Sequence, residues 1–315
     1  NLVDRLLDYE IPFSGIIRST DFTPHTGDND FWRSRLGLRR CRDLGGMLVT
    51  EQTKVLYTGG DGDIGKVFAR LASPKYKLRL TYYSDPIESD VHEVVQTDLT
   101  DIESVRAAMR GVDSVVHMGA NSSPRASWES ILNNNLIGTY NVYEAARLEG
   151  VRRVVFASSN WACAFHIAEH GKVGPKDAPI RPSTLYGVSK CFGEALGSHY
   201  YDTYGLSVIC LRIGRSHDAS DEGPNAEELV HMSNTNSDLG PYEGDLWLKL
   251  WVSNRDMTQL IEKSLETECG YGVFLACSDN QPAIYDLSET KRVLGYKPVH
   301  GIQQFWDFEK GCSRV

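Results

Sequence analysis

Tyr186 and Lys190 are the residues whose types and spacing suggest acid–base chemistry. They stand four positions apart in LYGVSKCFGEA, residues 185 to 195. On a helix this spacing places both side chains on one face, about one turn apart. A tyrosine normally ionises near pH ~10, so it needs a nearby positive charge to act as a base at neutral pH. The pair is either a proton-transfer centre or a solvated helix face, and the rest of the chain must decide between them.

A glycine-rich turn provides a second candidate for chemistry. Gly59, Gly62 and Gly65 follow the apolar run KVLYTG and open the helical pattern DGDIGKVFARLA. Glycines with this spacing let the backbone approach a pyrophosphate, which then lies at the helix N-terminus. Further along, Asp98 in TDLTD, and Gly119 and Ala120 in HMGA, end short predicted strands. These positions predict a dinucleotide crevice.

The residues after the second predicted strand bear on the choice between NAD and NADP. An acidic residue about 20 positions past the glycines would bind the ribose hydroxyls of NAD. Here LRLTYYSD supplies Tyr82 and Tyr83, with Asp85 slightly later, and no arginine follows to bind a 2′-phosphate. Asp61 and Asp63 in the glycine turn would repel that phosphate. The sequence therefore favours NAD, with NADP as the alternative.

The elements that must position these residues alternate along the chain. Strand-like runs occur in KVLYTG, YKLRLTYYS, VHEVVQTDL, DSVVHMGA, RRVVFASS and LSVICLRI, and helical patterns lie between them. The longest helical patterns are ESILNNNLIGTYNVYEAARLEG and the segment from Tyr186 to about HYYDTYG. Strands that alternate with helices predict an α/β fold with a doubly wound parallel sheet, the Rossmann arrangement. Residues 53–215 are expected to form this core.

Two segments depart from the alternation. Residues 1–52 are turn-rich and end in an arginine cluster, so we expect an N-terminal extension that acts as a packing strap or as a lid or exchanged arm. Residues 216–245 are polar and turn-rich, which suits a small substrate-binding lobe above the sheet. LWLKLWVSNRDMTQLIEKSLE is then expected to restore a helix and GVFLACS a strand, so that residues 216–315 form the lobe and C-terminal elements.

Composition excludes several other classes of protein. A net charge of -9 argues against general nucleic-acid binding, which needs a basic surface. No apolar run reaches the length of a membrane span, and the acidic residues in NLVDRLLDYEIPF argue against a secretory signal. The seven cysteines are scattered and lack a CxxC pattern, and the histidines lack metal-binding spacing. We therefore expect reduced thiols, a cytoplasmic location and no metal site.

Together these motifs resemble the extended short-chain dehydrogenase/reductase superfamily, over about residues 53 to 310. The likeness rests on the glycine turn, the serines of FASSN, Tyr186 with Lys190, and the closing LGYKP. It implies that Tyr186 is the base, Lys190 favours its phenolate, Ser159 holds the reacting oxygen and Asn135 positions the lysine. It further implies a cofactor site made of Gly59, Gly62, Asp63, Ile64, Gly65, Asp98, Leu99, Met118, Gly119, Ala120, Ser158, Tyr186, Lys190 and Ile213.

Within that superfamily, RPSTLYGVSKCFGEAL, NLIGTYNVYEAAR and WVSNRD look like the bacterial uronate dehydrogenases. These enzymes use NAD to oxidise the anomeric carbon of a hexuronate to a lactone, which implies a sugar or sugar-acid substrate here. Ser122, Ser159 and Asn160 match their substrate contacts. Trp161 and Arg215 replace a histidine and a serine of that group; Arg215 could bind a carboxylate or phosphate, and Trp161 could stack on a ring, or both could simply pack. The resemblance also implies a homodimer formed by the two longest helices.

Two other functions remain open from the sequence. A nucleotide-sugar epimerase would keep its NAD tightly bound, but LRIGRSHDA lacks the asparagine and YGP-like turn of those enzymes, and SSNWACAF lacks the Asp-Glu pair of the related dehydratases. A catalytically inactive, cofactor-sensing binding protein would be expected to have lost Tyr186 or Lys190, and both are present. The sequence therefore favours a dehydrogenase.

Overall fold

The computed structural model describes residues 52–171, 180–216, 220–234 and 245–315. The strap and lid hypotheses for the N-terminal extension lie outside the described residues, as does part of the polar insertion. No described helix is long and apolar enough to cross a membrane. Within the same residues, no cluster of three or more His, Cys, Asp or Glu side chains could hold a metal ion, and the six described cysteines are unpaired.

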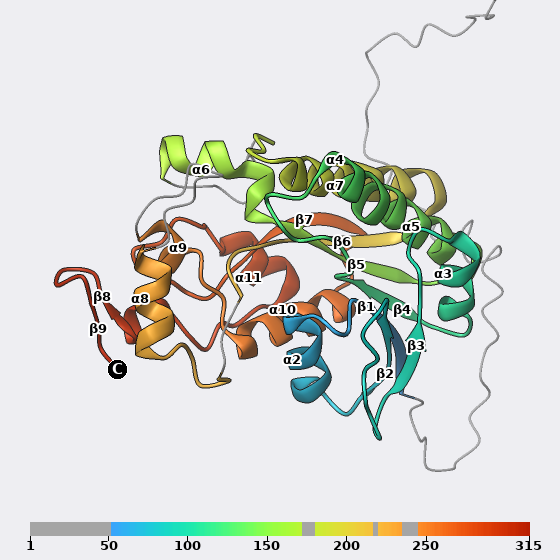
Figure 1. The fold of residues 1–315 in the computed structure, drawn as a ribbon, viewed down its shortest axis with the longest axis horizontal. Coiled ribbons are helices and arrows are strands. Elements are labelled where there is room, and N and C mark those ends of the chain that lie inside the picture. The colour runs from blue at the N-terminus through green and yellow to red at the C-terminus, as the bar shows by residue number, and fades with distance from the viewer. Residues whose placement is uncertain (1–51, 172–179, 217–219, 235–244) are drawn as a thin grey trace, which may run out of the picture. The chain divides into compact units, whose positions relative to one another are not determined.

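A seven-stranded parallel sheet forms the centre of the molecule, in the order β3-β2-β1-β4-β5-β6-β7 (Figure 1). Its strands are β1 (Thr53–Thr58), β2 (Tyr76–Tyr82), β3 (Glu93–Gln96), β4 (Ser114–His117), β5 (Arg153–Ser159), β6 (Ser207–Ile213) and β7 (Tyr271–Ala276). The central strands are buried on both faces, which explains their nearly continuous apolar sequences. The prediction of a doubly wound parallel sheet is confirmed.

Helices cover both faces of this sheet (Figure 1). One face carries α3 (Ile102–Met109), α5 (Gly138–Leu148) and α7 (Leu185–Tyr204), and the other carries α2 (Asp63–Leu71), α10 (Asn254–Glu266) and α11 (Ser288–Leu294). Two apolar clusters fill the spaces between sheet and helices, with Phe156 and Tyr143 in one and Tyr57 and Phe68 in the other. After β5 the chain forms a short 3-10 turn, η2 (Asn160–Cys163), and α6 (Ala164–His170).

The long helix expected before β5 contains a stretch of wider coiling. It begins as α4 (Trp128–Ser130), continues as the π-helical η1 (Ile131–Ile137) and then becomes α5. A π-helical turn adds a residue to the ordinary turn and redirects the side chains that follow, often at a functional site. Asn135 lies in this stretch, so its direction could not follow from α-helical periodicity.

The single helix predicted from LWLKLWVSNRDMTQLIEKSLE is wrong. The segment forms α9 (Leu246–Lys249), then an extended stretch in which Trp251 bridges to Arg215, and then α10. The break has a local cause, because the Ser253 side chain accepts a hydrogen bond from the backbone N–H of Asp256 and so caps a new helix.

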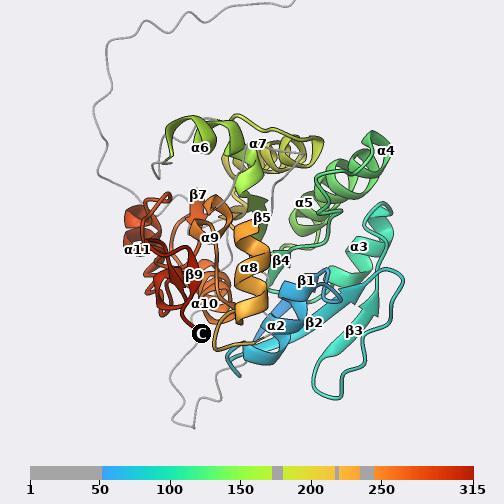
Figure 2. The same ribbon diagram turned by 60° about the vertical axis from the view of Figure 1, so that its left-hand side comes forward.

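A small lobe follows the core (Figure 2). It contains α8 (Ala226–Asn234), α9, the 3-10 turn η3 (Ile302–Gln304) and an antiparallel pair, β8 (Trp306–Asp307) with β9 (Cys312–Ser313). Its own buried cluster is built from Leu229, Met232, Leu248, Trp251, Ile302 and Trp306. The assignment of substrate binding to this lobe, and its start at residue 216, stay predictions.

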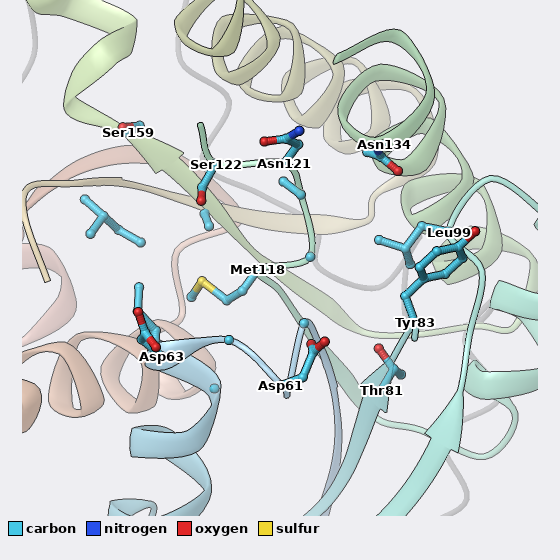
Figure 3. Close-up of a pocket in the computed structure, with 18 of the residues that line it drawn as sticks. Asp61, Asp63, Thr81, Tyr83, Leu99, Met118, Asn121, Ser122, Asn134 and Ser159 are labelled. Atoms are coloured by element: carbon cyan, nitrogen blue, oxygen red, sulfur yellow. The ribbon is translucent and has the colours of Figure 1, made fainter. Parts of the chain in front are cut away.

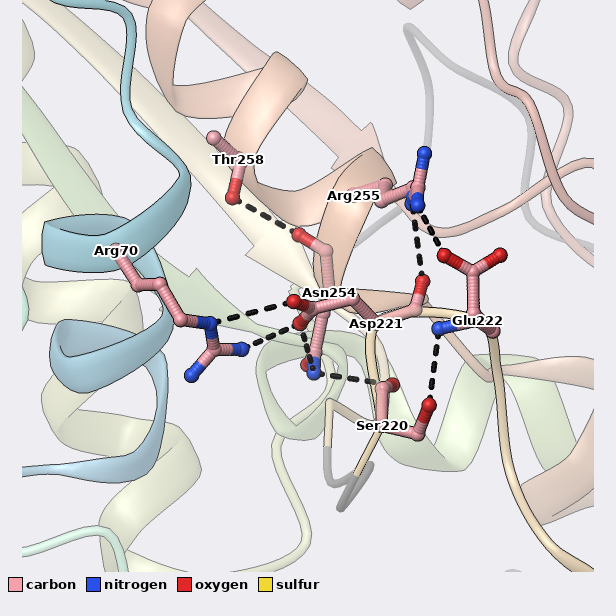
Figure 4. Close-up of polar contacts among 7 residues, drawn as sticks. All are labelled: Arg70, Ser220, Asp221, Glu222, Asn254, Arg255 and Thr258. Carbon is pink, nitrogen blue, oxygen red and sulfur yellow. Dashed lines mark hydrogen bonds and ion pairs between the residues drawn. The ribbon is translucent and has the colours of Figure 1, made fainter.

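Asp221 fastens the loop before α8 to the sheet-covering helices (Figure 4). Its carboxylate accepts hydrogen bonds from the guanidinium of Arg70 on α2 and from the side-chain amide of Asn254 on α10. The amide of Asn254 also binds the backbone oxygen of Ser220. Two residues later, Gly223 lies against the ring of Phe305 in the lobe. The loop is thus held between helices α2 and α10 on one side and the lobe on the other.

Candidate active site

A cavity of about 600 Å³ lies at the carboxyl ends of the strands, where a doubly wound sheet binds its ligands. The structure brings all the sequence-predicted cofactor residues to its lining: Gly59, Gly62, Asp63, Ile64, Gly65, Asp98, Leu99, Met118, Gly119, Ala120, Ser158, Tyr186, Lys190 and Ile213. Ser122 and Ser159 line it too. Residues that the sequence analysis did not propose also contribute, among them Thr81, Thr97, Asn121, Asn134, Gly214 and Ser216.

The glycine turn leaves no room for a side chain at Gly59 or Gly65. Gly59 has a φ of 71°, and a Cβ there would lie 3.0 Å from the backbone nitrogen of Gly119. A Cβ on Gly65 would lie 2.6 Å from the carbonyl oxygen of Gly59. Helix α2 begins at Asp63, directly after Gly62, so its free backbone N–H groups lie at the cavity. This bare backbone at a helix N-terminus fits a pyrophosphate, as NAD would require.

A series of hydrogen-bonded, buried polar side chains lies next to the glycine turn. The Thr58 hydroxyl accepts a hydrogen bond from the backbone N–H of Gly119 at 3.0 Å and lies 2.8 Å from Nδ1 of His117. The other ring nitrogen of His117 is 3.3 Å from the hydroxyl of Thr139. Burial, and secondarily the charge of Lys190, lowers the pKa of His117 to about 3. His117 is therefore a neutral scaffold residue, and nothing in its spacing within the sequence indicated this.

Acidic and aromatic side chains mark one end of the cavity. Asp61, Thr81 and Tyr83 lie together there, and Ser159 lies at the far end (Figure 3). Of the described residues that line the cavity, only Lys190 carries a positive charge. A 2′-phosphate at the Asp61 end would meet like charge with no cation to bind it. This distribution of charge agrees with the preference for NAD.

Tyr186, Lys190 and Ser159 meet at the far end. Tyr186 and Lys190 lie one turn apart near the start of α7, and the Lys190 ammonium is 5.3 Å from the centre of the Tyr186 ring. Burial raises the pKa of Tyr186 to about 12, while its hydrogen bond to Ser159 acts in the opposite direction. Burial also lowers the pKa of Lys190 to about 8. Without a cofactor, then, burial outweighs the groups that would stabilise the phenolate.

Asn135 binds the chain on both sides of the site. Its side-chain oxygen accepts a hydrogen bond from the backbone N–H of Asn121 at 2.8 Å, and its amide donates to the Asn121 carbonyl. The same amide donates to the hydroxyl of Ser189, at 3.0 Å. Asn135 therefore links the loop after β4 to the residue that precedes Lys190. Asn134, its neighbour, lines the cavity instead.

The hydroxyl of Ser158 is engaged away from the cavity, although the residue lines it. It donates to the carboxylate of Glu194, which forms an ion pair with Arg212. The sequence analysis did not propose Glu194 or Arg212. Glu194 follows Lys190 by four positions, so the helical spacing that joins Tyr186 to Lys190 could have indicated it.

Three predicted substrate residues lie outside the cavity lining. Asn160 is buried and accepts a hydrogen bond from the Ser159 hydroxyl at 3.0 Å. Trp161 is buried and its ring lies 5.7 Å from that of Trp247. The Arg215 guanidinium lies 5.5 Å from the centre of the same Trp247 ring. Direct contact of these residues with a substrate stays a prediction.

Comparisons with known proteins agree with this geometry. Residues 55–217 match the NAD dependent epimerase/dehydratase family. Uronate dehydrogenase from Pseudomonas putida is 35% identical, with 82% of this chain and 88% of that protein covered. The NAD-dependent glucose-6-phosphate dehydrogenase of Haloferax volcanii is 33% identical, with 80% and 95% covered. A crystal structure of a uronate dehydrogenase mutant from Agrobacterium tumefaciens, complexed with NAD, has a TM-score of 0.66 at 34% identity, over 80% of this chain and 86% of that one.

Proposed function

Because this chain belongs to the NAD dependent epimerase/dehydratase family, we propose that it is an NAD-dependent dehydrogenase. It oxidises the anomeric hydroxyl of a free sugar or sugar acid, which yields a lactone. The observation that carries this proposal is the meeting of Tyr186, Lys190 and Ser159 at one end of a cavity whose other side is a bare glycine turn. Such a cavity holds a dinucleotide and a small hydroxyl-bearing substrate side by side.

The residues of the chain divide the chemistry between them. Tyr186 takes the proton of the substrate hydroxyl on its phenolate oxygen, and Ser159 holds that hydroxyl by a hydrogen bond. Lys190 supplies positive charge one turn away, and Asn135 links the backbone of Asn121 to the side chain of Ser189, which precedes Lys190. When bound, NAD accepts a hydride and its cationic nicotinamide adds charge that favours the phenolate. The glycine turn and the backbone at the start of α2, at Asp63, would hold its pyrophosphate, and Ser158 and Ile213 line the cavity that would receive it.

The relatives of this chain differ in their sugars, so the substrate is proposed as a class. Uronates and glucose-6-phosphate, the sugars in the names of two relatives, carry an anionic group, whereas L-arabinose, the sugar in the name of a third relative at 34% identity, is neutral. Ser122 lines the cavity near Ser159, and Arg215 follows β6 directly after Gly214, which also lines it. We take Ser122, Asn160, Trp161 and Arg215 as the residues through which this chain distinguishes its sugar.

The proposal is tested by incubating the protein with NAD and with free uronates, neutral aldoses, sugar phosphates and nucleotide sugars, and following NADH absorbance. We expect net NADH formation with a free sugar or sugar acid and a loss of roughly 10²- to 10⁴-fold in kcat for Tyr186→Phe. Tyr204→Phe, an exposed change at the end of α7 far from Tyr186, is the control and should leave turnover unaltered. Absence of NADH with every sugar would overturn the proposal.

The same experiment separates the two alternatives. An epimerase re-reduces its intermediate, so a nucleotide sugar would be converted with no net NADH. A binding protein without catalysis would bind NAD with the same affinity in the wild type and in Tyr186→Phe, and neither protein would turn over any sugar. Net NADH that depends on Tyr186 contradicts both.

We also propose a homodimer and a cytoplasmic location. Leu185, Val188 and Phe192 form an exposed apolar face on α7, and Ile137 and Tyr140 are exposed around the start of α5. Exposed apolar faces of this kind suit contact with a second copy. Light scattering at micromolar concentration should give twice the chain mass, and Val188→Asp should give one chain mass; a monomeric wild type would contradict the dimer.

A further inference from the structure

Glu194 is a buried carboxylate that takes no part in the proton transfer described above. It lies on α7 four residues after Lys190 and eight after Tyr186, so the three side chains share one face of the helix. Only 3% of Glu194 and 6% of Arg212 are exposed. A charge at this depth is retained only with close partners, because water cannot solvate it.

Three donors converge on this carboxylate. The Ser158 hydroxyl donates to Oε1 at 2.5 Å, Nε of Arg212 donates to Oε1 at 2.8 Å, and Nη2 of Arg212 donates to Oε2 at 2.9 Å. Ser158 and Arg212 are direct partners in the register of β5 and β6. The carboxylate therefore ties α7 to two adjacent strands at a single point, with a bidentate geometry that restricts both distance and direction.

The helix also lies unusually close to the sheet at this point. A Cβ on Gly193 would lie 2.1 Å from the ring of Phe156, and one on Gly197 would lie 2.8 Å from the side chain of Val208. The hydroxyl of Tyr271 on β7 donates to the backbone oxygen of Glu194 at 3.0 Å. Close packing fixes how near α7 lies to the sheet, but glycines offer no side chains that would set its position along the strands.

The ion pair supplies a directional restraint beside the reacting groups. Ser158 directly precedes Ser159 on β5, and Lys190 stands one turn before Glu194 on α7. A displacement of Glu194 relative to Ser158 would therefore displace Tyr186 and Lys190 relative to Ser159. Misplacement of catalytic groups by about 1 Å can reduce turnover by roughly 100-fold.

We propose that the Glu194–Arg212 ion pair is a positioning element that sets where Tyr186 and Lys190 stand relative to Ser159. This inference rests on the proposed function, because its effect is read in sugar oxidation. The restraint acts on the proton-transfer end of the cavity and leaves the glycine turn untouched. Its loss should therefore reduce kcat and leave the KM for NAD nearly constant.

The first test is Glu194→Asp, which keeps the charge and shortens its reach by one methylene. We expect a folded protein with kcat reduced roughly 10- to 100-fold and a KM for NAD within about twofold of the wild type. A greater separation of Ser159 from Tyr186 should also move the rise of kcat to higher pH, because the Ser159 hydroxyl lowers the pKa of the phenol. If the Glu194–Arg212 pair only stabilised the fold, Glu194→Asp would change neither the pH profile of kcat nor the ratio of kcat to the KM for NAD.

A double variant, Glu194→Met with Arg212→Met, separates positioning from stability. Replacing a buried ion pair by apolar side chains of similar volume is often neutral for folding, so urea unfolding should resemble that of the wild type. We expect kcat to stay low in this folded protein. If the double variant fails to fold, Glu194→Asp alone decides.

Glu144→Asp is the matched control. Glu144 on α5 also binds α7, by accepting a hydrogen bond from Tyr200 at 2.9 Å, and it pairs with Arg147. Tyr200 lies near the other end of α7 from Tyr186. This variant should keep the kcat of the wild type. A folded Glu194→Asp or double variant with kcat within about twofold of the wild type would overturn the inference, as would equal losses in kcat for Glu144→Asp and Glu194→Asp.

Crystal structures give a readout that does not depend on turnover. The distance from the Ser159 hydroxyl to the Tyr186 hydroxyl should increase in Glu194→Asp relative to the wild type. If the wild type oxidises none of the sugars, the proposed function fails, and this distance still tests the positioning. An unchanged distance overturns the inference even where the wild type is active.

Discussion

Gly187 lies so close to the backbone of Trp161 that an added Cβ would stand 2.4 Å from the Trp161 carbonyl oxygen. The obstacle is backbone, so it cannot move aside as a flexible side chain could. Gly187 directly follows Tyr186 in α7, and Trp161 lies in the 3-10 turn that begins one residue after Ser159. This contact sets how closely the start of α7 approaches the segment that carries Ser159.

Gly187→Ala should therefore impair turnover more than it impairs folding. We expect a kcat reduced by more than about tenfold and a loss of roughly 1–3 kcal/mol in the free energy of unfolding. Steady-state kinetics and urea unfolding measure the two effects. Ala195→Ser, on the exposed side of the same helix, should change neither quantity appreciably. A Gly187→Ala protein with normal kcat would show that α7 can withdraw from Trp161 without cost to the reaction.

Lys190 should make the stability of the cofactor-free protein depend on pH. Its pKa falls from 10.5 to about 8 because burial disfavours the charged form. Below pH 8 the folded state carries that burial penalty in full, and between pH 8 and 10.5 the unfolded state binds the extra proton, so stability rises with pH. Lys190→Met lacks this penalty, and should be more stable at pH 7 by up to roughly 3 kcal/mol.

Urea unfolding of both proteins from pH 7 to 10.5 measures this difference. The advantage of Lys190→Met should shrink as the pH rises above 8 and vanish near 10.5. Subtracting the two curves removes the contribution of other groups that titrate in this range. A difference that stays constant with pH would mean that the folded protein solvates the ammonium as well as water does.

Asp221 should contribute to stability through the loop that it fastens (Figure 4). The Arg70 guanidinium holds the pKa of Asp221 below its usual range, with Asn254 acting in the same direction. Stabilisation from such a carboxylate is present above its unfolded pKa and is lost as the pH falls through the folded value. The partners are partly exposed, so Asp221→Asn should cost only about 1 kcal/mol at pH 7.

Thermal unfolding in buffers from pH 7 to 3 tests that assignment. The difference between wild type and Asp221→Asn should be greatest near neutral pH and disappear in the acid range. Glu222→Gln is the control in the same loop, because the Glu222 side chain is 75% exposed and its carboxylate should contribute little to stability. If Asp221→Asn is as stable as the wild type at pH 7, the Asp221 carboxylate does not stabilise the protein through this loop.

Asp61 should contribute to the choice of NAD over NADP. Its carboxylate lies at the end of the cavity beside Thr81 and Tyr83, where a 2′-phosphate would meet like charge (Figure 3). Asp61→Asn should lower the ratio of kcat/KM for NAD to that for NADP by roughly tenfold, mostly through better use of NADP. Asp85→Asn is the control, since Asp85 does not line the cavity. An unaltered ratio would assign the selectivity to other residues.

The sequence by itself determined the fold class and most of the residues that line the cavity. Glycines 59, 62 and 65 stand at a strand-to-helix junction, and the residues at the ends of parallel strands meet at one edge of the sheet whatever the packing details. Local periodicity also placed Tyr186 and Lys190 on one helical face. These features depend on short-range geometry, which is visible in the sequence as a regular spacing of residue types.

Only the tertiary structure decided the surroundings of those groups. The partners of Asn135, the bridge of Trp251 to Arg215 and the neutral His117 depend on contacts between distant segments. Glu194 and Arg212 stand 18 positions apart and become partners because β6 lies beside β5 under α7. A linear sequence does not show such pairs, because burial and long-range packing choose which polar groups meet. Here they join α7 to the sheet.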